Sequence, residues 1–195
     1  MTKKIFIWVA HPKSGSLCEA IANAYQSGAK LEGAEVRRMN LSEMSFDMNG
    51  FTGYNDDMPE LEADLQQWQD NVSWADHLFI VHPCWWGAMP AMAKMVFDRA
   101  LTAGFAYKYH NKGVKWDKLL VGKTADAIIT SDTPPIIDTL IYGKTGRKVL
   151  KNQVLGFCGI KVKKILQLGS IKLATSEKLN KWLYDIELMG QKAVV

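Results

Sequence analysis

Three short segments of this chain carry side chains whose types suit ligand binding. They are residues 10–16 (AHPKSGS), residues 83–87 (PCWWG) and residues 130–132 (TSD). A hydroxyl-rich loop that leads into a helix exposes free backbone N–H groups at the positive end of the helix dipole, and together these bind phosphate. Two adjacent tryptophans suit a flat aromatic ligand, and the third segment adds hydroxyl and carboxylate groups.

Each segment also has a purely structural interpretation. Ser14 or Ser16 is a suitable N-cap for the helix that follows, and Trp85 and Trp86 are large enough to close one end of the core. The polar residues 130–132 are typical of a turn. Taken one at a time, the segments leave both interpretations open, so their relative positions in the fold have to decide.

The elements that position these segments are strands. Residues 5–9 (IFIWV) form a continuous apolar run, which is typical of a strand buried on both faces of a parallel sheet. Four further strands are expected at residues 35–41, 77–82, 124–130 and 165–169. The three candidate segments lie at the ends of the first, third and fourth of these strands.

Apolar residues at helical spacing separate the strands. They predict helices near residues 17–31, 61–72, 90–101, 147–157 and 179–186, and they leave residues 42–59 and 104–123 irregular. The second irregular segment carries three of the thirteen tyrosines and tryptophans, and loops of such length tend to be functional. Because no linker or repeat divides the chain, residues 1–195 are expected to form a single doubly wound α/β domain.

A five-stranded flavodoxin-like parallel sheet, with strand order 2-1-3-4-5, brings the three segments together. In this order the carboxyl ends of the first, third and fourth strands lie side by side where the strand order reverses, which is where ligands bind. A phosphate-binding loop, an aromatic wall and a hydroxyl loop match the ribityl phosphate and isoalloxazine ring of a flavin. The sequence therefore predicts a flavin site at this edge of the sheet.

The chain lacks the residue patterns that phosphatases, serine hydrolases, nucleotide-binding loops and zinc proteases need. A phosphatase loop needs an arginine six positions after its cysteine, but Ala24, Pro90 and Lys164 stand at that distance from the three cysteines. The chain contains no GxSxG, GxGxxG, P-loop or HExxH pattern, and its four histidines lack metal-ligand spacing. His77 and His82 are therefore expected to be strand-end residues.

Composition narrows the function further. The formal net charge is +4, but the lysines are scattered among acidic residues, so we expect no nucleic-acid partner. Three cysteines without CxxC spacing argue against a disulfide framework and a zinc site. The apolar run at the N-terminus is too short for a signal peptide or a membrane span. We expect a cytoplasmic protein.

The sequence resembles the NAD(P)H:quinone oxidoreductase family, which comprises flavodoxin-like flavoproteins such as quinone reductases and the ancillary flavoproteins of potassium-efflux systems. Four patches carry the resemblance: AHP at residues 10–12 followed by Ser16, PCWWGAMPAMAKMVFDRALTAGFAY at residues 83–107, ITS at residues 129–131, and LGFCGI at residues 155–160. The second patch is the most specific, because its aromatic pair, its FDR triplet and its GFAY ending occur in that family at this spacing.

The resemblance implies a flavin cofactor, FMN with FAD as the alternative. The residues implied to hold it are His11, Ser14, Ser16, Leu17, Cys18, Pro83, Cys84, Trp85, Trp86, Gly87, Thr130, Ser131 and Asp132. It also implies that NAD(P)H and the acceptor alternate in an apolar slot lined by Trp86, Phe105 and Tyr107, which a partner subunit completes in a homodimer. Asp98 and Arg99 are expected to be structural.

Three features depart from the family pattern. Cys18 stands where the family often has asparagine, and residues 132–134 (DTP) replace a glycine pair. The tyrosine and histidine that often follow that glycine pair have no clear counterparts, so Tyr142 is the nearest candidate proton donor.

The implied activity is hydride transfer from NAD(P)H to the flavin and then to a quinone or a similar small acceptor in a ping-pong cycle. A flavin-bearing regulatory subunit with little turnover is the alternative. An electron-carrier flavodoxin fits less well, because such carriers are strongly acidic. A flavodoxin-like domain that binds no flavin is the remaining interpretation.

Overall fold

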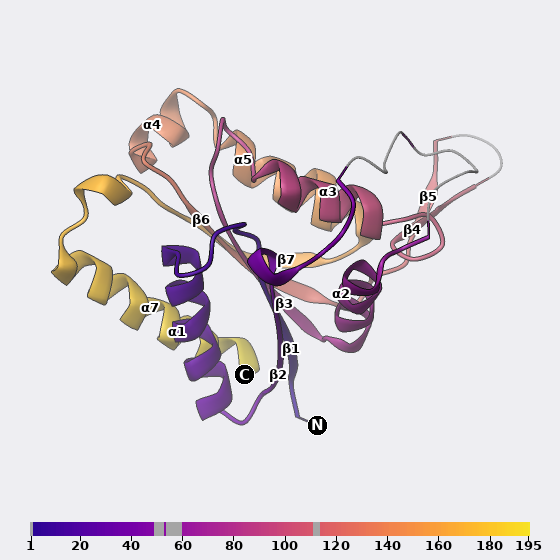
Figure 1. The fold of residues 1–195 in the computed structure, drawn as a ribbon, viewed down its shortest axis with the longest axis horizontal. Coiled ribbons are helices and arrows are strands. Elements are labelled where there is room, and N and C mark those ends of the chain that lie inside the picture. The colour runs from indigo at the N-terminus through magenta and orange to yellow at the C-terminus, as the bar shows by residue number, and fades with distance from the viewer. Residues whose placement is uncertain (1, 49–52, 54–59, 111–113) are drawn as a thin grey trace.

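A computed structural model of the chain describes residues 2–48, 53, 60–110 and 114–195. Its centre is a sheet of five parallel strands (Figure 1). The strands are β1 (Lys4–Val9), β2 (Glu35–Asn40), β3 (His77–Pro83), β6 (Thr124–Thr130) and β7 (Lys161–Leu168). They are ordered β2-β1-β3-β6-β7, which confirms the predicted order and the flavodoxin-like fold.

Helices cover both faces of the sheet (Figure 1). On one face lie α1 (Leu17–Leu31) and α7 (Ser176–Val194), and on the other lie α2 (Ala63–Trp74), α3 (Ala91–Ala100) and the helical stretch of α5 (Thr145–Lys148), η2 (Val149–Leu155) and α6 (Gly156–Cys158). The segment η2 is a π-helix. Among the described residues, no helix combines the length and the hydropathy needed to cross a bilayer.

Glycines bring α1 and α7 close together. A Cβ atom on Gly28 would lie 1.9 Å from the carbonyl oxygen of Glu187, and one on Gly190 would lie 2.2 Å from that of Tyr25. No side chain fits at either position. This contact fixes the position of α1, which directly follows the predicted phosphate loop.

The strands alternate their side chains between two apolar clusters, one on each face. In β1, Phe6 and Trp8 point to the cluster under α2 and α3, whereas Ile5 and Ile7 point to the cluster under α1 and α7. This explains why residues 5–9 read as one continuous apolar run. Trp8 lies edge-on against Phe97 with ring centroids 5.0 Å apart, so α3 is anchored on the central strands.

Several predicted boundaries were wrong. Strand β7 begins at Lys161 and not at residue 165, because its lysines belong to an edge strand and reach solvent there. The predicted irregular segment 104–123 contains a short antiparallel pair, β4 (Tyr107–Tyr109) and β5 (Trp116–Lys118). A short helix, α4 (Pro135–Leu140), was not predicted. Short 3₁₀ turns, η1 (Leu41–Glu43) and η3 (Ile171–Leu173), were not predicted either. Most of the predicted loop 42–59 lies outside the described residues.

A buried polar cluster ties α1 to the amino ends of β3 and β6. The Tyr25 hydroxyl lies 2.9 Å from His77 Nε2 and donates a 3.4 Å hydrogen bond to Asp126 Oδ2. His77 Nδ1 lies 2.7 Å from the Thr124 hydroxyl. Burial, and then the nearby Asp126, hold the pKa of Tyr25 well above its ordinary value, so the hydroxyl keeps its proton. His77 is thus a buried strand-end residue, as predicted.

Replacing Tyr25 with phenylalanine should lower the free energy of unfolding by about 1–2 kcal/mol, because His77 and Asp126 would stay buried with fewer partners. Urea unfolding measures the loss. Tyr184→Phe is the matched control, because that tyrosine is 61% exposed and its substitution should change stability by less than about 0.5 kcal/mol. Equal losses in both variants would contradict a structural role for the cluster.

Candidate functional site

The carboxyl ends of β1, β3 and β6 bring the three candidate segments into contact. The Cys84 N–H donates a 2.7 Å hydrogen bond to the Thr130 carbonyl oxygen, and Cys18 Sγ lies 3.5 Å from Thr130 Oγ1. The rings of His11 and Trp85 meet edge to face, with centroids 5.6 Å apart. Thr130 therefore joins the phosphate loop to the aromatic segment.

The predicted phosphate loop, residues 10–16, ends at the N-terminus of α1. Ser16 is the N-cap of α1 and accepts a 3.3 Å hydrogen bond from the Glu19 N–H. The N–H groups of Leu17 and Cys18 lie in the first turn, where a helix provides no partner for them. The side chain of Cys18 is buried, so this residue can offer only its N–H to a ligand.

His11 faces the start of this loop. Its Nδ1 accepts a 3.0 Å hydrogen bond from the Lys13 N–H, which stabilises the turn. Partial burial, and then the charge of Lys13, lower the pKa of His11, so the ring is neutral near pH 7. Ser14 is exposed at the tip of the loop.

A tight turn presents the tryptophans. Trp85 N–H donates to Ala88 O at 2.8 Å and Ala88 N–H donates back to Trp85 O at 3.1 Å, while Trp86 and Gly87 between them have φ angles of 51° and 78°. A bulky side chain rarely adopts such a φ, so Trp86 is strained. Trp86 is fully exposed and Trp85 is 47% exposed. Neither indole closes the core, which excludes the structural interpretation of this segment.

A cavity of about 890 Å³ lies beside this turn. Its floor is formed by side chains of three adjacent strands, His82 of β3, Ile129 of β6 and Gln167 of β7. Its walls include four predicted residues of the aromatic segment and the candidate proton donor, namely Cys84, Trp85, Trp86, Gly87 and Tyr142. Burial raises the pKa of the Cys84 thiol, so this thiol stays protonated at neutral pH.

The third segment, residues 130–132, does not line the cavity, and two of its three side chains are buried. Thr130 and Ser131 are buried, the Ser131 N–H donates to Leu168 O at 2.9 Å, and Ser131 Oγ lies 3.1 Å from Thr133 O. The Asp132 carboxylate lies 3.0 Å from the Lys172 ammonium and accepts from the Lys172 N–H. Both hydrogen bonds lower the pKa of Asp132. Of this loop, only Thr133 lines the cavity. Pro83 is also buried, at the end of β3.

The three residues predicted to line the substrate slot do not share one surface of the chain. Trp86 lines the main cavity, whereas Phe105 packs against the core and Tyr107 lines a second cavity of about 530 Å³. Lys94, Val149 and Val154 line both cavities, so the two spaces adjoin.

His82 is the functional candidate that the sequence did not reveal. Its Nδ1 lies 2.9 Å from the Pro83 carbonyl oxygen, which can only accept, so Nδ1 carries the proton. Its Nε2 is then an acceptor, and it is buried without a partner among the described residues. An unpaired buried acceptor costs free energy, so a donor from a ligand or water is expected there. Its place at the end of a strand, just before the aromatic segment, was the available signal.

A second unpredicted feature is a partly buried ion pair at the cavity wall. Asp138, which lines the cavity, pairs with Arg147, and Arg147 also donates to Thr139 Oγ1 at 3.2 Å. The amide of Gln167 reaches Ser131 Oγ at 2.9 Å and Asp138 Oδ2 at 2.8 Å when its nitrogen faces the carboxylate. Asp138 and Arg147 lie in different helices, and Gln167 lies in β7, so no local sequence pattern marks them.

Arg99 has the predicted structural role. It is completely buried, donates to Glu62 Oε2 at 2.7 Å and to Glu60 O at 3.2 Å, and so holds the segment before α2 against α3. Asp98 pairs with Lys94 one helical turn away, at 2.5 Å.

Comparisons with known proteins agree with this geometry. Residues 3–184 match the family described as flavodoxin-like fold. An uncharacterized NAD(P)H oxidoreductase of Haemophilus influenzae is 32% identical over 187 residues, which cover 94% of this chain and 90% of that protein.

Two solved structures share the fold. The NAD(P)H:quinone oxidoreductase from Methanothermobacter marburgensis superposes with a TM-score of 0.79 at 20% identity, covering 99% of this chain and 100% of that one. The FMN-dependent NADH-azoreductase of Bacillus anthracis, solved in complex with FMN, superposes with a TM-score of 0.73 at 18% identity and covers both chains completely.

The strain at Trp86 can be separated from its role toward a ligand. Trp86→Gly should raise the free energy of unfolding of the flavin-free protein by about 1 kcal/mol, because glycine adopts positive φ freely. Trp85→Gly should instead lower it, since Trp85 contacts His11 and glycine is costly where φ is ordinary. Chemical unfolding compares the two variants. If Trp86→Gly also lowered stability, the turn would not be strained.

His82 should make the folded state sensitive to acid. Burial lowers its pKa from 6.5 to about 4, so the unfolded chain takes up a proton that the folded state excludes as the pH falls through this window. Stability that is present above pH 6.5 is therefore lost towards pH 4.

His82→Gln should remove this loss. Between about pH 7.5 and pH 5, the parent protein should lose about 2 kcal/mol more unfolding free energy than this variant, measured by urea unfolding at both pH values. The exposed His110, replaced by glutamine, serves as control and should behave like the parent. Identical acid sensitivity of the parent and His82→Gln would refute the assignment.

Proposed function

This chain belongs to the flavodoxin-like family of NAD(P)H oxidoreductases and quinone reductases, and from that premise we propose that it is a flavin-dependent NAD(P)H oxidoreductase that reduces quinones or similar small acceptors. The observation that supports this most is the cavity at the carboxyl edge of the sheet, which is lined by the exposed aromatic turn of Trp85 and Trp86.

The residues present fit a flavin. The unpaired N–H groups at the start of α1 and the helix dipole suit its phosphate. The turn of Trp85 and Trp86 suits its ring, and the unpartnered Nε2 of His82 offers an acceptor to a donor group in the cavity. We propose FMN as the cofactor, because the loop offers donors for one phosphate and the azoreductase of the same fold is FMN-dependent. FAD remains the alternative.

A bound flavin would supply the two-electron chemistry between NAD(P)H and the acceptor. The chain orients the reactants and sets the electrostatics. The neutral ring of His82 and the protonated thiol of Cys84 place no full charge at the floor of the cavity, and the charge of Asp138 is neutralised by Arg147. Tyr142 lines the cavity with more than half of its surface exposed, so its hydroxyl is our candidate proton donor.

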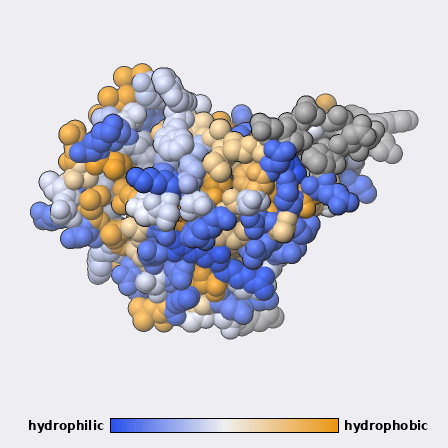
Figure 2. All heavy atoms as spheres, in the orientation of Figure 1, coloured by the Kyte–Doolittle hydropathy of each residue, from blue (hydrophilic) through white to orange (hydrophobic). Residues whose placement is uncertain are grey.

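We further propose that the active form is a homodimer. Large apolar side chains are exposed at and around the cavity mouth, and Figure 2 shows hydrophobic residues at the surface over α4. The exposed side chains are Trp86 and Tyr142, which line the cavity, and Ile136, Leu140 and Ile141 in and just after α4. Large apolar side chains that are exposed near a cavity are typical of an interface. We propose that a second copy on this surface completes the apolar slot that Trp86 lines.

The test starts from the purified protein. We expect a yellow protein whose released cofactor is identified as FMN by mass, and rapid consumption of NADH or NADPH only when a quinone is added. A yellow protein without turnover would favour the regulatory subunit. A colourless protein that gains no absorption from added FMN or FAD would refute the proposal.

A further inference from the structure

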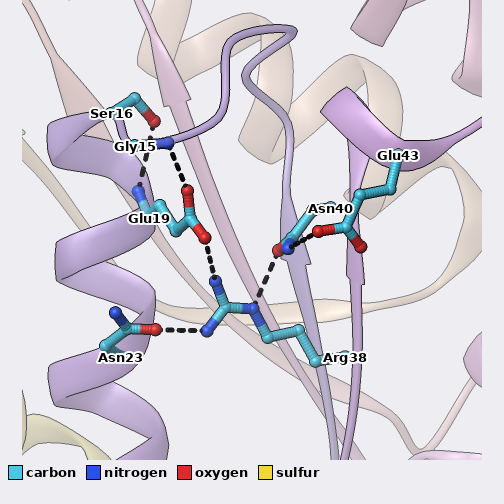
Figure 3. Close-up of polar contacts among 7 residues, drawn as sticks. All are labelled: Gly15, Ser16, Glu19, Asn23, Arg38, Asn40 and Glu43. Carbon is cyan, nitrogen blue, oxygen red and sulfur yellow. Dashed lines mark hydrogen bonds and ion pairs between the residues drawn. The ribbon is translucent and has the colours of Figure 1, made fainter.

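The carboxylate of Glu19 accepts a hydrogen bond from a backbone N–H of the predicted phosphate loop. Its Oε2 accepts a 2.6 Å hydrogen bond from the Gly15 N–H, in the loop just before the N-cap Ser16 (Figure 3). The interaction resembles a capping box, in which a glutamate of the first turn satisfies a backbone donor at the helix start. The loop thus already holds one negative charge of the chain itself.

The other oxygen of Glu19 faces a cation. Oε1 lies 3.7 Å from Nη2 of Arg38, on β2, which is longer than a good ionic hydrogen bond (Figure 3). Asn40 Oδ1 and Asn23 Oδ1 accept from Nε and Nη1 of Arg38, at 2.8 and 2.5 Å. The guanidinium is therefore fixed in place, and its Nη2 is directed at Glu19.

The Glu19 carboxylate can consequently give up its hydrogen bond to the Gly15 N–H and pair with Arg38 instead. While it remains on Gly15, its negative charge repels any phosphate at the first turn of α1. If it moves to Arg38, the Gly15 N–H becomes free for the phosphate. The exposed Lys13 adds a cation to the loop, but it does not remove this competition.

We propose that Glu19 is an internal competitor for the phosphate-binding loop, and that Arg38 receives its carboxylate when a phosphate ester binds. Glu19 thereby determines how much the phosphate of the ligand adds to binding, and it keeps that contribution small. This proposal rests on the proposed function only in taking a flavin phosphate as the ligand.

The test compares FMN with riboflavin, which has the same ring and no phosphate. Dissociation constants for the flavin-free protein come from quenching of flavin fluorescence. Glu19→Gln keeps an acceptor for Gly15 and a capping-box residue, so it should fold. It should bind FMN about tenfold more tightly and leave riboflavin binding unchanged. Glu43→Gln, which removes the same charge from the residue that accepts from Asn40, is the control and should shift neither constant by more than about twofold.

A double-mutant cycle tests the role of Arg38. Arg38→Gln should weaken FMN binding several-fold, because Glu19 then has no second partner, and this effect should disappear in the Glu19→Gln background. An undiminished effect there would mean that Arg38 attracts the phosphate directly, which contradicts its proposed role.

The outcomes separate this inference from the proposed function. If the parent protein bound no flavin, the proposed function would fail. If it bound FMN but Glu19→Gln left FMN binding unchanged, or tightened riboflavin binding equally, Glu19 would not compete for the phosphate and only this inference would fail.

Discussion

The hydrogen bond from the Cys84 N–H to the Thr130 carbonyl oxygen is the constraint on which the site depends. Cys84 follows Pro83, the last residue of β3, and its N–H extends the backbone contacts between β3 and β6 past the end of the strand. Directly after it the chain leaves the sheet and reverses through the turn of Trp85 to Ala88. Because Thr130 also contacts Cys18, the same point sets the position of α1 relative to that turn. One residue at the end of β6 thereby determines the spacing of the parts that would contact a ligand.

The site concentrates unfavourable features that the rest of the fold must offset. Trp86 has a strained backbone and an exposed indole, His82 keeps a buried acceptor without a partner among the described residues, and Glu19 places a negative charge on the predicted phosphate loop. Such departures persist only where the surroundings over-determine the structure, and they cluster at functional sites. Here the surroundings are the aromatic packing of Trp8 with Phe97 on one face and the close contact of α1 with α7 on the other.

The sequence predicted what local patterns encode. Apolar runs located the inner strands, and the alternation of strands and helices led to the correct strand order and to the meeting of three segments at one edge of the sheet. What it missed depends on tertiary position. The lysines of β7 conceal a strand because that strand lies at the edge of the sheet. The pairing of Asp138 with Arg147 and the orphaned nitrogen of His82 become visible only when burial is known. Thr130 and Ser131 were predicted as ligand-binding residues, a role that stays a prediction, while the fold gives their side chains internal partners.

The π-helical segment η2 determines the shape of the space beside the site. Val149 and Val154 are five residues apart, and in an α-helix such residues point about 140° away from each other. A π-turn closes its hydrogen bond over five residues, so the two valines lie on the same side of the helix and both line the two adjoining cavities. The π-helical backbone conformation of η2 therefore places the wall that the two cavities share. The size of its side chains changes only how far this wall extends into each cavity. Larger residues at these positions would narrow each cavity, whereas only a change in helical pitch could turn this wall away from one of them.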